Sequence, residues 1–166
     1  NFPEVWARLA ARGAELVVWP SAYSAGTTLQ AHALAHHFYI VTATQTCDCL
    51  VYDITGDEML YEKREGLNIS RFSLDLDRGI YHENFNVEKR DRLLAEHGGE
   101  VQQEKWLQRE QWFVLRARKA GVSARRLARE YGLEELRDYV ARSRREIDRL
   151  RGWPIAGQCK GGAGGR

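Results

Sequence analysis

The sequence lacks the features that would place it in a membrane or in a disulfide-stapled secreted fold. Its 166 residues contain no run of about 18 apolar residues, which a membrane-spanning helix would need. Its three cysteines are an odd number, so they do not form a secreted disulfide framework. A structural zinc site needs four ligands, and neither the C-x-C pair nor the scattered histidines supply a recognised zinc spacing. We therefore expect no membrane association, no metal and no cofactor.

The composition that remains is that of an ordinary globular protein. It is 43% hydrophobic and 29% charged, and its length suits one domain with an appendage. The chain begins at Asn1 and enters an amphipathic pattern at once, with no signal-like lead. This start predicts a C-terminal piece of a longer protein, or a processed chain.

The small net charge of +2 conceals two regions of opposite sign. Residues 1–86 hold 6 basic and 11 acidic side chains, whereas residues 87–166 hold 19 basic and 12 acidic side chains. The regions therefore differ by twelve charges, from −5 to +7. Such a division predicts two surfaces with different roles.

Apolar spacing in the acidic region predicts alternating helices and strands, which is typical of helices packed on a sheet. Asn1 is expected to cap the first helix, which holds Pro3 and Glu4 in its first turn. The expected elements are a helix to about residue 12, a buried strand over 16–19, a helix from 27 or 28 to 37, a strand over 38–44, a hairpin over 49–61 and a half-buried strand over 71–76.

The basic region is predicted to be helical. The expected helices cover residues 87–97, 100–120 and 123–151, with a break in the last one near Gly132. Residues 156–166 are rich in glycine and are expected to form a flexible tail.

The strongest motif stands at the start of the chain. It reads Asn1-Phe2-Pro3-Glu4, then Gly13-Ala14-Glu15-Leu16, then Pro20-Ser21-Ala22-Tyr23, and it is followed by Asp53-Ile54-Thr55-Gly56-Asp57 and by Leu74-Asp75-Leu76-Asp77. These segments resemble the carbon–nitrogen hydrolase family, the nitrilase superfamily, over roughly residues 1–77. The resemblance implies the second half of an αββα sandwich, in an enzyme that is usually a homo-oligomer.

The resemblance also implies a chemistry for the parent enzyme. In the family a Glu removes the proton of a Cys thiol, the thiolate attacks a nitrile or amide carbon, and a Lys with a backbone N–H holds the developing negative charge. The family motif places all three residues upstream of Asn1. The chain alone is therefore expected to contain no catalytic residue and to be inactive.

Four residues are expected to bind substrate. The family position of Asn1 faces the substrate, and an Asn there cannot hold a substrate carboxylate by charge. Ser21, Ala22 and Tyr23 follow a strand end, where pockets of layered αβ folds form; an ordinary capped loop is the alternative. Glu4 is interpreted as a helix-start residue, because an acid is favourable in the first turn.

Two further groups of residues have structural interpretations. Cys47 and Cys49 would share one face of a strand and are expected to be buried rather than to hold a metal or act as a nucleophile. His32 and His36 share a helix face, and a surface or interface role is favoured over a ligand role.

The basic segment permits two hypotheses. Residues 122–133 resemble the first helix and turn of a DNA-binding helix-turn-helix. However, Glu134 and Glu135 would then face phosphate, which is unfavourable. A stripe of apolar residues instead favours packing against the acidic region or a neighbouring subunit: Leu127, Tyr131, Leu136, Val140, Ile147 and Leu150.

Together these patterns predict an α/β chain in three parts: the hydrolase half-domain over 1–86, a basic helical extension over 87–155 and the tail. The expected parent hydrolyses non-peptide C–N bonds of small amides, nitriles or carbamoyl compounds in the cytoplasm. The alternatives are a non-catalytic binding or scaffold protein of the same fold, and nucleic-acid binding through the basic segment.

Overall fold

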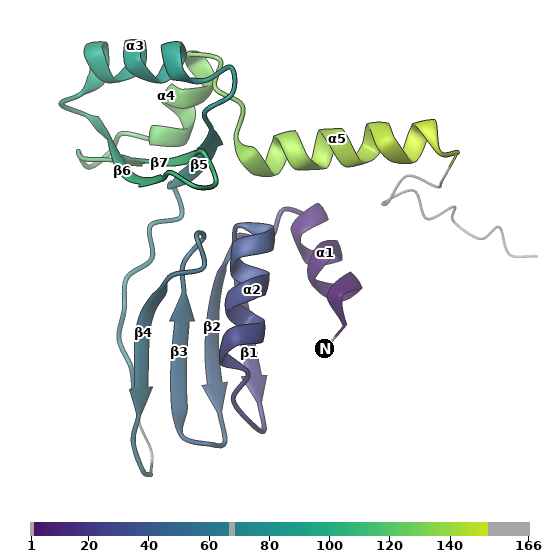
Figure 1. The fold of residues 1–166 in the computed structure, drawn as a ribbon. Coiled ribbons are helices and arrows are strands. Elements are labelled where there is room, and N and C mark those ends of the chain that lie inside the picture. The colour runs from purple at the N-terminus through teal and green to yellow at the C-terminus, as the bar shows by residue number, and fades with distance from the viewer. Residues whose placement is uncertain (1, 67–68, 153–166) are drawn as a thin grey trace, which may run out of the picture.

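A computed structural model describes residues 2–66 and 69–152 of the chain. It shows a mixed α/β protein in which these residues form two sheets and five helices (Figure 1). The first sheet is mixed and four-stranded, and the second is antiparallel and three-stranded. The expected α/β class is confirmed at this level.

The first sheet has strand order β1-β2-β3-β4, in chain order. Strands β1 and β2 are parallel, and the other neighbours are antiparallel. Its elements are α1 (Pro3–Ala11), β1 (Leu16–Ser21), α2 (Gly26–His36), β2 (Tyr39–Thr44), β3 (Asp48–Tyr52) and β4 (Glu58–Lys63). These elements follow the predicted order of helix, strand, helix, strand and hairpin. The residue before α1 is Phe2 rather than the expected cap Asn1, which lies outside the described residues.

Helices α1 and α2 cover the same face of this sheet. Trp6 of α1 packs in one buried cluster with Leu29 and Ala33 of α2 and with Ile40 of β2. Burying such side chains stabilises each helix by far more than its intrinsic propensity does. One face of the sheet is therefore closed by helices.

Strand β1 lies at the edge of the sheet and is not buried as predicted. Val18 is 63% exposed and Leu16 is 40% exposed, on the face opposite the helices. Pro20, expected to end the strand, is instead inside it. Proline is tolerated there because an edge strand does not need every N–H for its one neighbour.

The β3–β4 hairpin is closed by Asp53. Its carboxylate accepts hydrogen bonds from the N–H groups of Thr55, at 2.8 Å, and Asp57, at 3.0 Å. Gly56 has a φ of +79°, and a Cβ at this position would lie 2.9 Å from the Cβ of Leu34. The turn therefore requires glycine for both its backbone angle and its contact with α2.

The second sheet has strand order β5-β7-β6. Its strands are β5 (Gly79–His82), β6 (Val101–Leu107) and β7 (Trp112–Ala117), and α3 (Val87–His97) and α4 (Ala124–Glu130) pack on it. The prediction of a helix over 100–120 is wrong, because these residues form the β6–β7 hairpin. The region after residue 86 is therefore not helical throughout, and β5, which precedes that residue, belongs to this sheet. The half-buried strand expected over 71–76 is also absent, since these residues pair with no strand.

The two sheets share a hydrophobic cluster. Tyr39 and Ile54 from the first sheet pack with Ile80 and Val114 from the second sheet and with Leu136, the first residue of α5. Helix α5 (Leu136–Leu150) then extends away from the second sheet (Figure 1). The expected break near Gly132 is confirmed, because it separates α4 from α5.

No helix in the described ranges is long and apolar enough to span a membrane.

Candidate functional site

A groove lies between α1 and the edge strand β1. It has a volume of about 500 Å³. From α1 it is lined by Phe2, Val5, Trp6 and Leu9, and from β1 by Val17, Val18, Trp19 and Ser21. Tyr23, Ala25, Thr28 and Leu29 complete the lining. The groove is thus an apolar trough with a few hydroxyl groups.

Two of the four residues predicted to bind substrate meet in this groove. Ser21, at the end of β1, accepts a hydrogen bond at its Oγ from the N–H of Tyr23, at 3.3 Å. The ring of Tyr23 is 68% exposed. Ala22 does not line the groove, and Asn1 lies outside the described residues. Whether any of them binds substrate stays a prediction.

The lining of the groove limits its chemistry. Its described residues include no carboxylate, thiol, imidazole or amine, so they offer no base that would activate the hydroxyl groups of Ser21, Tyr23 and Thr28. Hydroxyl groups and apolar walls can hold and orient an uncharged ligand. This groove therefore suits binding, with any reactive group supplied from elsewhere.

The first residue of β3, Asp48, is a carboxylate surrounded by hydroxyl groups that the sequence analysis did not single out. Asp48 is buried and accepts hydrogen bonds from Thr44 and from Thr46, at 3.0 Å. Burial by itself would raise the pKa of Asp48, but the hydrogen bonds from Thr44, Ser24 and Thr46 outweigh it and lower the pKa. Asp48 thus holds the β1–α2 loop, which carries Tyr23, against the β2–β3 turn. The spacing Thr-x-Thr-x-Asp was the available signal.

The cysteines beside Asp48 differ from the prediction. Cys47 is exposed in the turn, with a φ of +60°, and β3 begins only at the next residue. Cys49 is half-buried on β3. The expected common burial of both thiols is therefore wrong for Cys47. In the described part of the chain no cluster of three potential metal ligands occurs.

The acidic residues of the motif are held by arginines from later in the chain. Glu15 pairs with Arg125 and with Arg137, which lie at α4 and α5. Asp53 is bound by Arg78 at 3.0 Å. The two pairs of Glu15 join the basic segment to the acidic first region, whereas Arg78 belongs to that first region itself. These ion pairs give both carboxylates a structural role.

Arg78 lies at the centre of the junction between the sheets. Besides Asp53, it binds Glu104 of β6 at 2.7 Å and the hydroxyl of Tyr39 at 3.1 Å. Burial alone would lower the pKa of Arg78, but the bond to Tyr39 and the charges of Asp53 and Glu104 outweigh it and raise the pKa. The guanidinium is therefore permanently charged in a buried position.

Three of the five histidines, His32, His36 and His37, lie on α2 or directly after it. His32 stacks on Trp6, with ring centroids 4.5 Å apart, and His36 stacks on His32 at 5.9 Å. Burial lowers the pKa of both. His32 thus packs between α1 and α2, and the expected surface or interface role of the two residues stays a prediction. His37 is buried beyond them, against Trp112, and its Nδ1 lies 3.3 Å from the carbonyl of Ile54.

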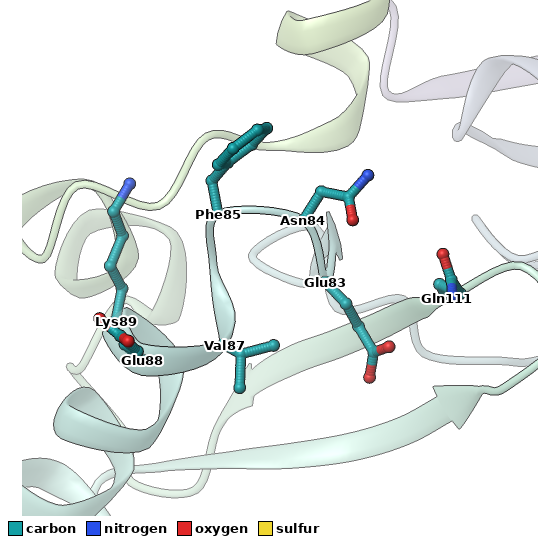
Figure 2. Close-up of a pocket in the computed structure, with 7 residues that line it drawn as sticks. All are labelled: Glu83, Asn84, Phe85, Val87, Glu88, Lys89 and Gln111. Atoms are coloured by element: carbon teal, nitrogen blue, oxygen red, sulfur yellow. The ribbon is translucent and has the colours of Figure 1, made fainter.

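A second hollow, of about 620 Å³, lies at the loop between β5 and α3 (Figure 2). The side chains around it are Glu83, Asn84, Phe85, Val87, Glu88, Lys89 and Gln111. Phe85 is 91% exposed and has a φ of +63°. Lys89 is occupied, because its Nζ donates to the carbonyl of Gly132 at 2.7 Å. Because acidic, basic and apolar side chains are mixed around this hollow, they do not indicate one class of ligand or reaction.

Comparison of the chain with protein families, with curated proteins and with solved structures finds no match.

Proposed function

We propose that this chain is the C-terminal half of a carbon–nitrogen hydrolase whose Cys, Glu and Lys lie upstream. In this proposal the parent enzyme hydrolyses a small amide, nitrile or carbamoyl compound through an acyl-enzyme. The proposal rests on the motif at residues 1–23 and on the hairpin motif around Asp53 and Gly56. The chain contributes one side of the site and no reacting group.

The observation that carries the proposal is the open groove beside β1. A strand, helix and parallel strand connect with a right-handed crossover in nearly all cases. Helices α1 and α2 cover the same face of the sheet, so the same crossover would place a strand preceding α1 on the outer edge of β1. That edge is unpaired among the described strands, and the groove above it is apolar. A nucleophile at the end of such a strand would lie near Ser21 and the start of α1.

The opposite face of the first sheet gives further support. Leu16 and Val18 expose apolar surface there, away from the two helices. In an αββα sandwich this face packs against a second sheet, and the αββα arrangement is part of the proposal. A half-domain is expected to leave such a face uncovered.

The start of α1 suits a thiolate in this proposal. No side chain caps the helix, so its first N–H groups and its dipole favour negative charge nearby. The groove then binds the uncharged part of the substrate, with Ser21 and Tyr23 as the polar contacts.

The test is to express the chain together with its encoded upstream segment and to measure ammonia release from a panel of small amides and nitriles. We expect turnover that is lost when the upstream nucleophilic Cys is replaced by Ala, whereas the chain alone shows none. The proposal would be contradicted if the upstream segment contained no Cys in C-x-D context and no Glu and Lys. Intact residues with ligand binding but no turnover would instead support a non-catalytic binding protein of this fold.

A further inference from the structure

Helix α5 exposes an apolar stripe beyond its first turn. Leu136 is 4% exposed in the cluster shared by the two sheets, but Val140 and Ile147 are each 45% exposed and Leu150 is 72% exposed. The main contact of α5 is with β5, at the start of the helix, and Figure 1 shows the rest of the helix passing above α2 and α1. The stripe is therefore available to another molecule.

The stripe has the spacing of a coiled coil. Leu136, Val140, Ser143, Ile147 and Leu150 follow one another in steps of four, three, four and three residues. In heptad notation Val140 and Ile147 take position a, and Ser143 and Leu150 take position d; Leu136 has the spacing of a further d position but is buried in the cluster between the sheets. β-Branched residues at a with Leu at d favour two parallel helices.

The charges beside the stripe also select a parallel pair. All three e positions are arginines, Arg137, Arg144 and Arg151, whereas the g positions are Tyr139 and Glu146. In an antiparallel pair the e positions face one another, which would set arginine against arginine. In a parallel pair each g position faces the e position five residues later. Glu146 would then meet Arg151 of the second copy, and Tyr139 would meet Arg144, a cation–π combination.

We propose that α5 pairs with α5 of a second copy of this chain as a short parallel two-stranded coiled coil. The inference does not depend on the proposed enzymatic function. The exposed stripe runs from Val140 to Leu150, so roughly one and a half heptads take part. Ser143 also leaves a small polar residue at a central d position. A weak, concentration-dependent dimer is therefore expected.

The first test is sedimentation equilibrium of the full 166-residue chain over a range of concentrations. We expect Ile147→Asp to raise the dissociation constant of the dimer at least tenfold. The matched control is Arg145→Asp, on the outer face of the same helix, which changes the charge by more and should leave the dimer intact. Circular dichroism confirms that both variants keep the native helix content. A wild-type chain that stays monomeric, or a dimer unaffected by Ile147→Asp, overturns the proposal.

The second test uses a variant that is expected to strengthen the dimer, so its result does not depend on a disruptive substitution. Ser143→Leu places leucine at the central d position and should tighten the dimer at least tenfold; no change would contradict the proposal.

The third test determines whether the two α5 helices pair in the parallel orientation. Glu146→Arg and Arg151→Glu should each weaken the homodimer, because they set like charges together. An equimolar mixture of the two variants should restore association as a heterodimer. If the mixture does not associate, the parallel arrangement is excluded. If the native chain stays monomeric but its stripe binds an acidic protein, that protein takes the place of the second copy and the proposal is overturned.

Discussion

The guanidinium of Arg78 bonds to carboxylates from both sheets, in a position that is 6% exposed. Removing the positive charge would leave the buried Asp53 with Lys105, whose Nζ lies 3.7 Å away, as its remaining cationic partner. We expect Arg78→Gln to lower the free energy of unfolding by about 3 kcal/mol, since breaking a buried pair is strongly destabilising. Denaturant titration followed by circular dichroism measures this change.

The control for this prediction is Arg64→Gln. Arg64 pairs with Glu62 at 3.4 Å, but its side chain is 64% exposed. Solvent screens such a pair, so the loss should stay below about 1 kcal/mol. Equal losses for the two variants would show that the Arg78 network does not hold the junction.

His37 predicts a pH dependence of stability. Burial lowers its pKa from 6.5 to about 4, the hydrogen bond to Ile54 opposes this shift, and the charges of Arg137 and His36 add to it. The unfolded chain therefore binds a proton that the folded chain excludes between pH 6.5 and 4. Stability contributed by this group is complete above pH 6.5 and is lost as the pH falls toward 4, by about 3 kcal/mol in total.

The measurement is the denaturation midpoint between pH 7 and 5, where most carboxylates stay ionised. In the variant His37→Asn, asparagine tolerates the observed φ of +55°, and the side chain no longer binds a proton in this pH range. We expect the slope of stability against pH to flatten in this variant. An unchanged slope would assign the pH dependence to other groups.

At the residue scale, the motif located part of the candidate site. Ser21 and Tyr23 line the groove, because the Pro-Ser-Ala-Tyr segment covers the last two residues of β1 and the first two residues after it. The spacing Thr-x-Thr-x-Asp marks only part of the surroundings of Asp48, because Ser24 comes from a different loop. Local patterns do not show which loops meet at the carboxyl ends of strands.

At the scale of elements, β1 allows the half-domain proposal to be tested by association. Val18 is exposed on the open sheet face, so Val18→Glu should change the stability of this chain by less than about 0.5 kcal/mol. The same variant should weaken binding of a separately expressed upstream half at least tenfold, because it would bury a charge at the contact. Pull-down of the upstream half on the immobilised chain measures the binding.

The control for Val18→Glu is Tyr61→Glu. Tyr61 is 53% exposed and lies on β4, at the opposite edge of the sheet. This variant should bind the upstream half as the native chain does. Equal loss in both variants would show that the open edge and face at β1 are not the docking surface.

Elements with clear local signals were predicted, and those defined by distant partners were not. Helix α3 has a well-placed start and stop, and the β3–β4 turn contains glycine. The β6–β7 hairpin turns at Gln108–Gln111, where Gln111 adopts a φ of +56° and no glycine or proline marks the turn. The clustered aromatic and apolar residues of this segment then fit a helix as well as two strands. Strand β5 has only four residues and exists because β7 pairs with it.

At the scale of the whole molecule, the shared cluster and ion pairs predict one cooperative unit. Tyr39, Val114 and Leu136 are buried in the same cluster although they belong to three separate parts of the fold. We expect both sheets to unfold in a single transition, so that tryptophan fluorescence and far-ultraviolet circular dichroism give the same midpoint. Leu136→Ala should lower the free energy of unfolding by about 2–4 kcal/mol and shift the midpoints of both signals together. Two separated transitions in the native chain would contradict this coupling.

Pro20 gives the open edge of β1 one more property. The carbonyls of Glu15 and Ser21 accept hydrogen bonds from Tyr39 and Gln45, so the odd-numbered residues of β1 face β2 and the even-numbered residues face outward. Pro20 therefore lacks an N–H on the outward side. An unrelated strand cannot continue its hydrogen-bond ladder past this point, which discourages the edge-to-edge stacking that leads to aggregates. A chain with an uncovered edge thereby keeps a measure of protection in solution.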